Sequence, residues 1–328
     1  MEPIRRAVID VGTNSVKLLV ADVAGHDVQP VREESKQTRL GHGFYEAHRL
    51  RPEAIEATAK AVAGFAATAR QCQALSIRVI ATSAAREAVN ASELVAVIQR
   101  ASGLKVEVIS GDQEADWALQ GVTSDSQLAH APLVLLDVGG GSTQFILGQG
   151  EYKRFRHSFP LGTVRLLEQL PHADPPQPAE LAGCRRWLRG FLQAEVRPRL
   201  MSPTEDGSQR DGGGSLENVQ LVGVGGTATI LGCMEARLET FDRARLEATR
   251  LSAARVSWYL EHLWSLALAE RKQIVGLPKN RADVILMGVA IYQAVMEEFG
   301  FRELRISTRG LRFAAMMDAA GYHEGPTP

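Results

Sequence analysis

The chain has 328 residues, enough for two domains that each bury a hydrophobic core. Its net charge is −1, so no overall positive charge attracts it to a nucleic acid polymer or an anionic membrane, and a polyanionic partner would need a local basic surface. Three widely spaced cysteines without CxxC spacing disfavour a disulfide framework or a zinc site. With no signal peptide and no apolar run of the ~18 residues that a membrane span needs, we expect a cytoplasmic protein.

The first predicted feature is the hairpin VIDVGTNSVKLLVADV at residues 8–23. Two apolar runs flank a polar turn that begins at Asp10 and ends at Ser15. An acid at the end of a buried strand, followed by glycine and hydroxyl residues, suits a phosphate and its metal ion. Asp is also a common turn residue, so the motif alone leaves an ordinary tight turn open.

Strands and helices then alternate, which predicts a sheet with crossover helices. A helix is expected over 52–70 with Pro52 in its first turn, and a buried strand over 77–82 with Ser83 capping the next helix. The strand at 105–110 leads into a helix whose start has the Ser110–Gln113 spacing of a capping box.

The hairpin recurs in the second half of the chain. VLLDVGGGSTQFIL at 134–147 repeats AVIDVGTNSVKLLV at 7–20, an offset of 127 residues (134 minus 7) that aligns Asp137 with Asp10. Two copies in the same strand–turn–strand context indicate equivalent hairpins of two similar domains facing across a cleft. We place these domains at 1–128 and 129–328, with the last helix, about 310–322, free to pack back on the first.

The remaining second-half elements follow local signals. We expect a helical stretch around 179–200, a flexible surface loop over 201–218, and a strand, glycine turn and helix over 219–231. A helix over 281–300 ends on its stop glycine, and a strand, a turn and a last helix close the chain, with no third domain expected.

Three turns, at 10–15, 137–143 and 223–227, carry glycines after a strand, which lets backbone amides converge on an anion. None has the spacing of a Walker loop or a dinucleotide fingerprint. We therefore expect a phosphate between the two hairpins, as in actin-like ATPases and sugar kinases. Asp10 and Asp137 would hold Mg²⁺ or another divalent cation. The third turn equally fits close packing of a helix on a strand.

Eight motifs occur in order over nearly the whole chain: IDVGTNS, ATSAAREAVN, VISGDQEA, LLDVGGGST, PLGTVRL, GVGGTAT, RADVILMG and STRGLR. Together they resemble the exopolyphosphatase / guanosine pentaphosphate phosphatase (Ppx/GppA) family, in a short form without the additional HD-like domain of longer relatives. The resemblance implies an α/β fold of two actin-like (ribonuclease H-like, ASKHA) domains. It also implies Mg²⁺-dependent hydrolysis of terminal phosphoanhydrides and a catalytic glutamate in the SGxxEA motif, here Glu114.

The residues themselves agree with that role. Glu114 lies in the first turn of a helix that follows a strand, where its carboxylate can align and deprotonate a water for in-line attack. Arg86, one turn into its own helix, would neutralise charge on the transferring phosphoryl group. A solvated helix acid and a surface arginine are the alternatives. The expected phosphate-binding residues are Gly12, Thr13, Asn14, Ser15, Gly139, Gly140, Gly141, Ser142, Thr143, Gly225 and Gly226.

Two positions depart from the family pattern. The residue before the catalytic glutamate is often acidic but is Gln113 here, and GGGSTE is replaced by a sequence ending in Gln144. If the missing acid holds metal or water, Gln144 affects metal geometry or rate but not the fold. The basic run at 153–157 and the arginines of 185–199 form either a track for a polyanion or a solvated surface. Arg309 fits either a substrate contact or structural pairing.

The best-supported function is a phosphoanhydride hydrolase that removes the terminal phosphate of inorganic polyphosphate. The alternatives are hydrolysis of guanosine pentaphosphate, a nucleotide of the stringent response, and a phosphate- or nucleotide-binding sensor without turnover. A sugar kinase is a fold-level alternative, but no independent sugar-binding motif is found. A homodimer is left open.

Overall fold

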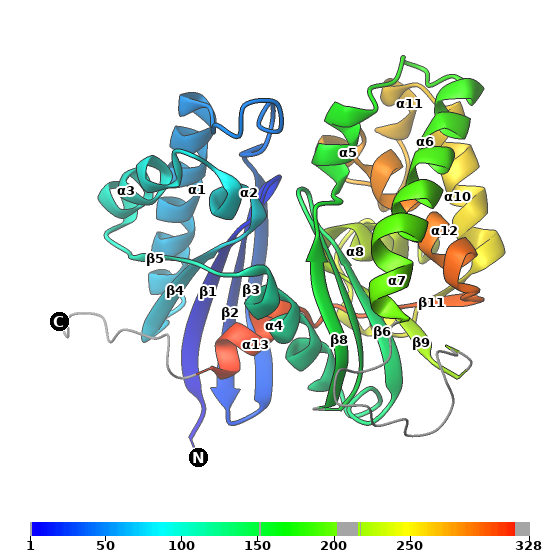
Figure 1. The fold of residues 1–328 in the computed structure, drawn as a ribbon. Coiled ribbons are helices and arrows are strands. Elements are labelled where there is room, and N and C mark those ends of the chain that lie inside the picture. The colour runs from blue at the N-terminus through cyan, green and yellow to red at the C-terminus, as the bar shows by residue number, and fades with distance from the viewer. Residues whose placement is uncertain (1, 151, 202–215, 217, 319–328) are drawn as a thin grey trace. The chain divides into compact units, whose positions relative to one another are not determined.

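The computed structural model describes residues 2–150, 152–201, 216 and 218–318, which form two compact α/β units (Figure 1). The first unit contains the chain up to Ser124 together with the segment from Arg309 onward. The second unit runs from Asp125 to Thr308. The division thus falls between 124 and 125 rather than between 128 and 129, and the last helix belongs to the first unit.

The first unit is built on a five-stranded sheet of order β3-β2-β1-β4-β5. The strands are β1 (Ile4–Val11), β2 (Ser15–Ala24), β3 (Asp27–Gln37), β4 (Ser76–Ala81) and β5 (Val106–Val108). β1, β2 and β3 are antiparallel, whereas β4 and β5 run parallel to β1. The apolar β1 is buried on both faces, as expected for a strand covered by helices on two sides.

Its helices are α1 (Pro52–Gln71), α2 (Ser83–Glu87), α3 (Ala91–Ser102), α4 (Gly111–Thr123) and α13 (Leu311–Met317). Alternate residues of β1 face different helices, so Ile9 packs in the cluster with α1 and α3, and Val8 packs with Trp117 of α4 and Phe313 of α13. By the same alternation, Asp10 lies on the face covered by α4 and α13.

Two local predictions about helix starts had different outcomes. Ser110 caps α4 as expected, accepting the N–H of Gln113 at 3.1 Å. The expectation for Ser83 was wrong, because Thr82 occupies the cap position of α2. Ser83 is the first helical residue, and its hydroxyl donates to Glu87 at 2.7 Å.

The second unit has a six-stranded sheet of order β10-β11-β9-β6-β7-β8. Its strands are β6 (Pro132–Val138), β7 (Thr143–Gln149), β8 (Tyr152–Phe159), β9 (Gln220–Val224), β10 (Arg250–Ser252) and β11 (Glu303–Ile306). Apart from β10, the order β8-β7-β6-β9-β11 matches β3-β2-β1-β4-β5, with the same parallel and antiparallel pairs. The register shifts also coincide, at Val20/Ala21 and Leu147/Gly148, which are 127 residues apart. The repeat seen in the sequence is therefore a repeat of structure.

The helices of the second unit are α5 (Thr163–Gln169), α6 (Pro178–Phe191), the π-helix η1 (Leu192–Val196), α7 (Arg197–Leu200), α8 (Gly225–Glu235), α9 (Arg243–Glu247), α10 (Ala253–Ser265), α11 (Leu268–Arg271), the 3₁₀-helix η2 (Lys279–Arg281) and α12 (Ile285–Phe299). α12 is buried along most of its length and forms the centre of this core.

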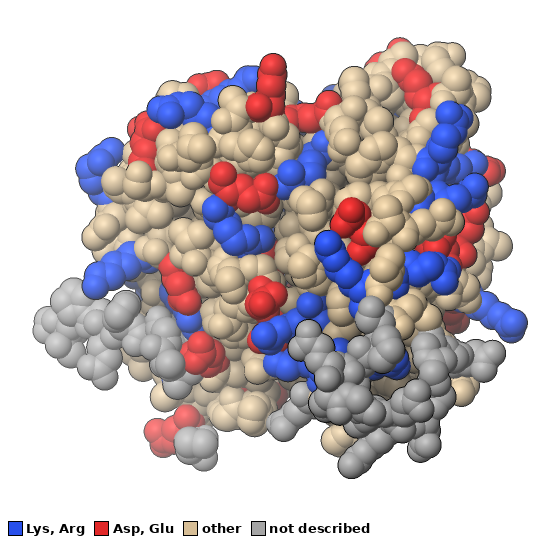
Figure 2. All heavy atoms as spheres, viewed as in Figure 1, with Lys and Arg blue, Asp and Glu red and all other residues tan. Residues whose placement is uncertain are grey.

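The helix expected over 281–300 begins later, at Ile285, but ends as predicted on Gly300 in the left-handed conformation (φ 74°). Most of the loop expected over 201–218 lies outside the described residues, as does the end of the 310–322 helix. Among the described helices, none is both long and apolar enough to cross a membrane. Basic and acidic side chains are interspersed over the surface seen in Figure 2, in keeping with the net charge of −1.

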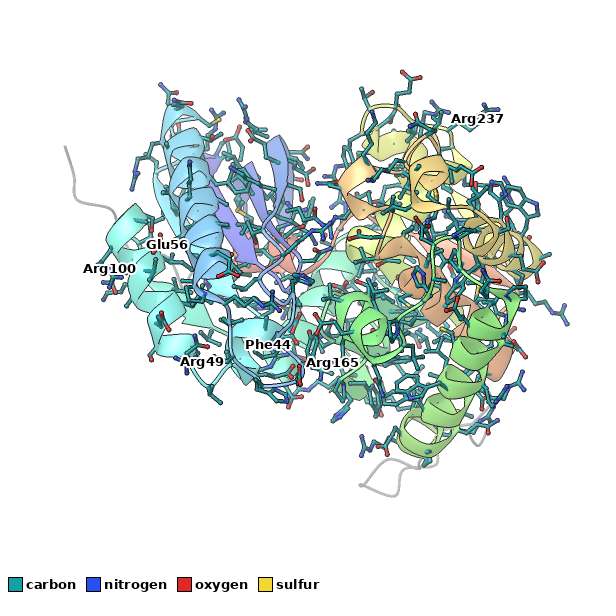
Figure 3. The ribbon with its side chains drawn as sticks, turned by 90° about the horizontal axis from the view of Figure 1, so that it is seen from above. Phe44, Arg49, Glu56, Arg100, Arg165 and Arg237 are labelled. Carbon is teal, nitrogen blue, oxygen red and sulfur yellow. The ribbon has the colours of Figure 1, made fainter. Side chains whose placement is uncertain are left out.

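The C-terminal segment is joined to the first unit through Arg78 of β4. This side chain, 5% exposed, pairs with Glu107 at 2.8 Å and with Asp318 at 3.0 Å, and it lies over the ring of Trp117. Arg78→Ala should therefore lower the free energy of unfolding by about 2–3 kcal/mol, measured by urea denaturation. The matched control is Arg100→Ala on the outer side of α3 (Figure 3), which should change it by less than about 0.5 kcal/mol. Equal effects of the two variants would contradict this role.

Candidate active site

The turn between β1 and β2 is held by backbone hydrogen bonds. The N–H of Gly12 donates to the carbonyl of Ser15 at 3.0 Å. The segment after β3 packs against the same turn, because the N–H groups of Thr38 and Arg39 donate to the carbonyl of Asn14 at 3.2 and 3.0 Å. The N–H of Gly41 donates to the carbonyl of Thr13 at 2.8 Å. The expected phosphate-binding residues of the first half thus lie in one fixed turn.

Asp10 is the last residue but one of β1, beside this turn, and is 4% exposed. Its Oδ1 is buried and has no hydrogen-bond partner among the described residues. Burial raises the pKa of Asp10, whereas the charges of Lys17 and Arg312 act to lower it. A buried carboxylate oxygen without a donor fits a bound cation.

Two further polar groups of the turn are buried without a partner in the described part of the chain, namely Nδ2 of Asn14 and Oγ of Ser15. The Oδ1 of Asn14 accepts from Gln37 at 3.2 Å, which fixes the amide. Buried donors of this kind are costly unless a ligand or water accepts from them. They suit the oxygens of a phosphate.

Glu114 and Arg86 form an ion pair, although 28 residues separate them. The Nη1 of Arg86 donates to Oε2 of Glu114 at 3.1 Å and to the carbonyl of Ile109 at 2.9 Å. Glu114 lies in the first turn of α4 and is 7% exposed. Arg86 therefore orients the glutamate directly, a contact that sequence reasoning did not anticipate when it assigned Arg86 to the phosphoryl group.

The turn between β6 and β7 repeats the first one. The N–H of Gly139 donates to the carbonyl of Ser142 at 2.9 Å. The start of α5 supports the loop, because the N–H of Val164 donates to Gly140 at 2.8 Å and Nε of Arg165 to Gly141 at 2.8 Å. Arg165 is labelled in Figure 3.

Two neighbours complete this loop. A Cβ at Gly162 would lie 2.4 Å from the carbonyl oxygen of Gly140, so only glycine allows this approach. The hydroxyl of Thr143 donates to the carbonyl of Leu161, and it holds the loop in place. The PLGTVRL motif, which had no assigned role in the sequence analysis, therefore supports the second turn.

Asp137 is the last residue but one of β6, as Asp10 is of β1, and it is 8% exposed. Gly225, the first residue of α8, has φ 78°, and a Cβ there would lie 2.1 Å from Oδ1 of Asp137. The third glycine turn thus allows the backbone of α8 to approach the carboxylate closely. The adjacent Gly226 lies in the first turn of α8.

The two basic runs of the sequence lie on different elements of the second unit. Residues 153–157 belong to β8, and the arginines of 185–199 lie on α6 and α7. Four of these arginines form ion pairs with glutamates: Arg185 with Glu261, Arg189 with Glu297, Arg197 with Glu298 and Arg199 with Glu195. Much of their charge is therefore neutralised within the unit, as in a solvated surface.

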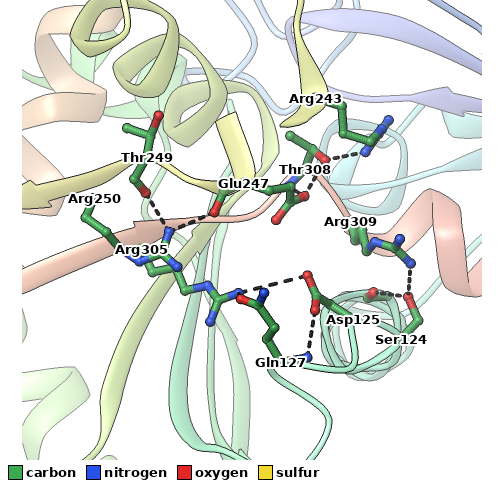
Figure 4. A network of polar contacts seen from close by, with 11 residues as sticks. Ser124, Asp125, Gln127, Arg243, Glu247, Thr249, Arg250, Arg305, Thr308 and Arg309 are labelled. Carbon is green, nitrogen blue, oxygen red and sulfur yellow. Dashed lines mark hydrogen bonds and ion pairs between the residues drawn. The ribbon is translucent and has the colours of Figure 1, made fainter. Parts of the chain in front are cut away.

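Arg309 has a structural contact, since its Nη1 donates to Oγ of Ser124 at 3.2 Å (Figure 4). Sequence reasoning also missed Lys17, which lies directly opposite Asp10 in the β1–β2 register. The spacing of the hairpin contained this signal, because residues at equal distances from the turn are paired across it. In the described residues, no cluster of three or more His, Cys, Asp or Glu side chains suits a metal.

Comparison with known proteins places these features in a family. The profile of the Ppx/GppA phosphatase family matches residues 19–323. Exopolyphosphatase 2 of Mycobacterium tuberculosis is 31% identical over 332 residues, covering 97% of this chain and 99% of that protein. Uncharacterized protein SCO0757 of Streptomyces coelicolor is 28% identical over 316 residues, with 95% and 89% covered.

Solved structures agree. The Ppx/GppA family member of Aquifex aeolicus is 27% identical with a TM-score of 0.75, covering 96% of this chain and 97% of that one. An exopolyphosphatase from Cytophaga hutchinsonii is 23% identical with a TM-score of 0.82, covering 96% and 98%, and shares the fold. The expected α/β fold of two similar units is confirmed, and it is the fold of the Ppx/GppA family member of known structure.

The burial of Asp10 leads to a pH-dependent prediction. Since its folded-state pKa is raised, the penalty of its charge is present above that pKa and is lost as the pH falls through it. Asp10→Asn should therefore raise the Tm of the metal-free protein at pH 8, and raise it less at pH 5, measured by differential scanning calorimetry. Each kcal/mol gained corresponds to about 2–4 °C in a unit of this size.

The control has the opposite sign. Asp22 is hydrogen-bonded by Arg5, which lowers its pKa below the ordinary value, so its stabilising charge is fully present at both pH 5 and pH 8. Asp22→Asn should lower the Tm about equally at the two pH values. A Tm of Asp10→Asn below that of the wild type at both values would contradict the assignment.

Proposed function

Since the chain belongs to the Ppx/GppA phosphatase family and is a phosphoanhydride hydrolase, we propose that it is an exopolyphosphatase that releases orthophosphate from the end of inorganic polyphosphate. The observation that carries the proposal is Glu114, a buried carboxylate held by Arg86 on a helix that covers the sheet face of Asp10. The full-length similarity to a protein named exopolyphosphatase 2 supports the choice of substrate.

In the proposed reaction, Glu114 aligns a water molecule and accepts its proton as the water oxygen bonds to the terminal phosphorus. The bond from that phosphorus to the bridging oxygen breaks, and the bridging oxygen leaves with the shortened chain. The products are orthophosphate and a polyphosphate one unit shorter. Arg86 acts as a positioning residue, because its hydrogen bond fixes the carboxylate that receives the proton.

The two turns would bind the phosphoryl oxygens through the backbone and side chains of Gly12–Ser15 and Gly139–Thr143. The unpartnered Asn14 and Ser15 groups support this role. Asp10 and Asp137 would hold Mg²⁺ or another divalent cation, which supplies positive charge against the phosphates when bound. The buried Oδ1 of Asp10, which has no hydrogen-bond partner among the described residues, fits this chemistry.

Phosphate release from polyphosphate and guanosine pentaphosphate should be measured side by side, with Mg²⁺ and with EDTA. We expect Mg²⁺-dependent release with a higher kcat/KM on polyphosphate. A higher kcat/KM on guanosine pentaphosphate would keep the reaction and change the substrate, since the two share the reactive group. Binding of both without release would indicate a sensor and overturn the proposal.

Replacing the catalytic carboxylate tests the mechanism. Glu114→Ala should lower kcat on polyphosphate by about 10²–10⁴-fold, because the attacking water loses its base, while polyphosphate binding by isothermal titration calorimetry is retained. Asp112→Asn is the matched control, since Asp112 is an exposed acid of the same helical turn and its loss should leave kcat unchanged. An equal loss of folded protein and activity in Glu114→Ala, seen by thermal melting, would mean that Glu114 is structural.

A further inference from the structure

Gln144 occupies the middle of a row of three side chains on one face of the second sheet. It is paired with Asp137 across β6–β7 and with Ser158 across β7–β8. Directly opposite residues of neighbouring antiparallel strands point to the same face. Gln144 is 1% exposed, so its amide has to find its hydrogen bonds within the protein.

Those hydrogen bonds lead to two serines. Nε2 of Gln144 donates to Oγ of Ser142 at 3.0 Å and to Oγ of Ser158 at 2.9 Å. A hydroxyl that accepts from an amide keeps its own hydrogen for another acceptor. Ser142 is also the residue whose carbonyl closes the second turn by accepting the N–H of Gly139. The amide therefore leaves Ser142 as a hydrogen-bond donor at the turn.

The first unit has the same row with a different charge. Asp10 is paired with Lys17, and Lys17 with Ser35, so acid and serine recur while the middle residue is a lysine. The charge of Lys17 acts on Asp10 and favours its ionised form against burial. The corresponding residue opposite Asp137 is neutral. The two strand-end carboxylates thus lie beside residues of different charge.

We propose that Gln144 is a positioning residue of the second turn. Its amide orients the hydroxyl of Ser142 so that this hydroxyl donates to a phosphate oxygen of the substrate. Because Gln144 is neutral, Asp137 is the one charged residue of the row that it forms with Gln144 and Ser158. This inference rests on the proposed function. A carboxylate at position 144 would accept the hydrogen of Ser142 and withdraw it from the phosphate. It would also place a second negative charge opposite Asp137, which attracts a cation and repels the polyphosphate.

Four variants test the positioning role through KM and kcat on polyphosphate. Gln144→Ala and Ser142→Ala should each raise KM about five- to tenfold with a smaller change in kcat, because one hydrogen bond to the substrate is lost or misdirected. The double variant should be no worse than either single one, since both remove the same interaction. Ser158→Ala is the matched control, because it removes the other hydrogen bond of Gln144, and its KM should stay within about twofold of the wild type.

The charge of the row is tested without turnover. Gln144→Glu should bind Mg²⁺ more tightly than the wild type, measured by isothermal titration calorimetry on protein without substrate, while its KM for polyphosphate rises by about tenfold or more. An unchanged KM would mean that the side-chain oxygen, not the nitrogen, faces the two serines, and this would overturn the proposal. Unchanged Mg²⁺ affinity would overturn the role of the row in cation binding.

Further outcomes separate this inference from the proposed function. If the wild type releases no phosphate from polyphosphate, the proposed function fails. The Mg²⁺ affinities of the wild type and Gln144→Glu then still test the role of the row in cation binding. If the wild type is active and KM is unchanged in Gln144→Ala, or if the effects of Gln144→Ala and Ser142→Ala simply add, the positioning role fails. Should Gln144→Ala not fold, Gln144→Met fills a similar volume without hydrogen bonds and replaces it in the same comparison.

Discussion

Each half of this chain buries an aspartate near the end of its central strand, Asp10 in β1 and Asp137 in β6. A buried charge is strongly unfavourable unless it is paired, protonated or bound to a cation. Lys17 and Arg312 act on Asp10, and Gly225 brings the start of α8 to Asp137. Under the proposed function these two carboxylates would hold the cation, so their burial would affect both the stability of the fold and the binding of the cation.

The two units share one strand arrangement but differ in the residues added to it. Strand order, register shift and the hydrogen bond that closes the turn are the same in both, so the repeat preserves the backbone. The additions differ: the first unit carries Glu114 on α4, and the second supports its turn from α5. Under the proposed function, the repeated turns would bind phosphate and Glu114 would supply the catalytic carboxylate.

Charge runs in the sequence had two interpretations, and long-range pairing favours the solvated surface for the arginines of α6 and α7. Arg189, for example, pairs with Glu297 of α12, 108 residues away. A second network in the same unit joins Arg305 to Gln127 and Thr308 to Glu247 (Figure 4). Such pairs depend on which helices and strands become neighbours, which a run of basic residues does not reveal.

The sequence by itself determined the features that depend on near neighbours in the chain. These are the two hairpins and their repeat, the cap of Ser110, the stop at Gly300, and, through ordered motifs, the family and its α/β fold. Only the tertiary structure decided that Arg86 holds Glu114, that Gly225 makes room for Asp137, and that Asp318 returns to Arg78, 240 residues earlier. Local patterns reflect hydrogen bonds and periodicity within a few residues, whereas these contacts arise when helices pack on a sheet and bring distant side chains within a few ångströms.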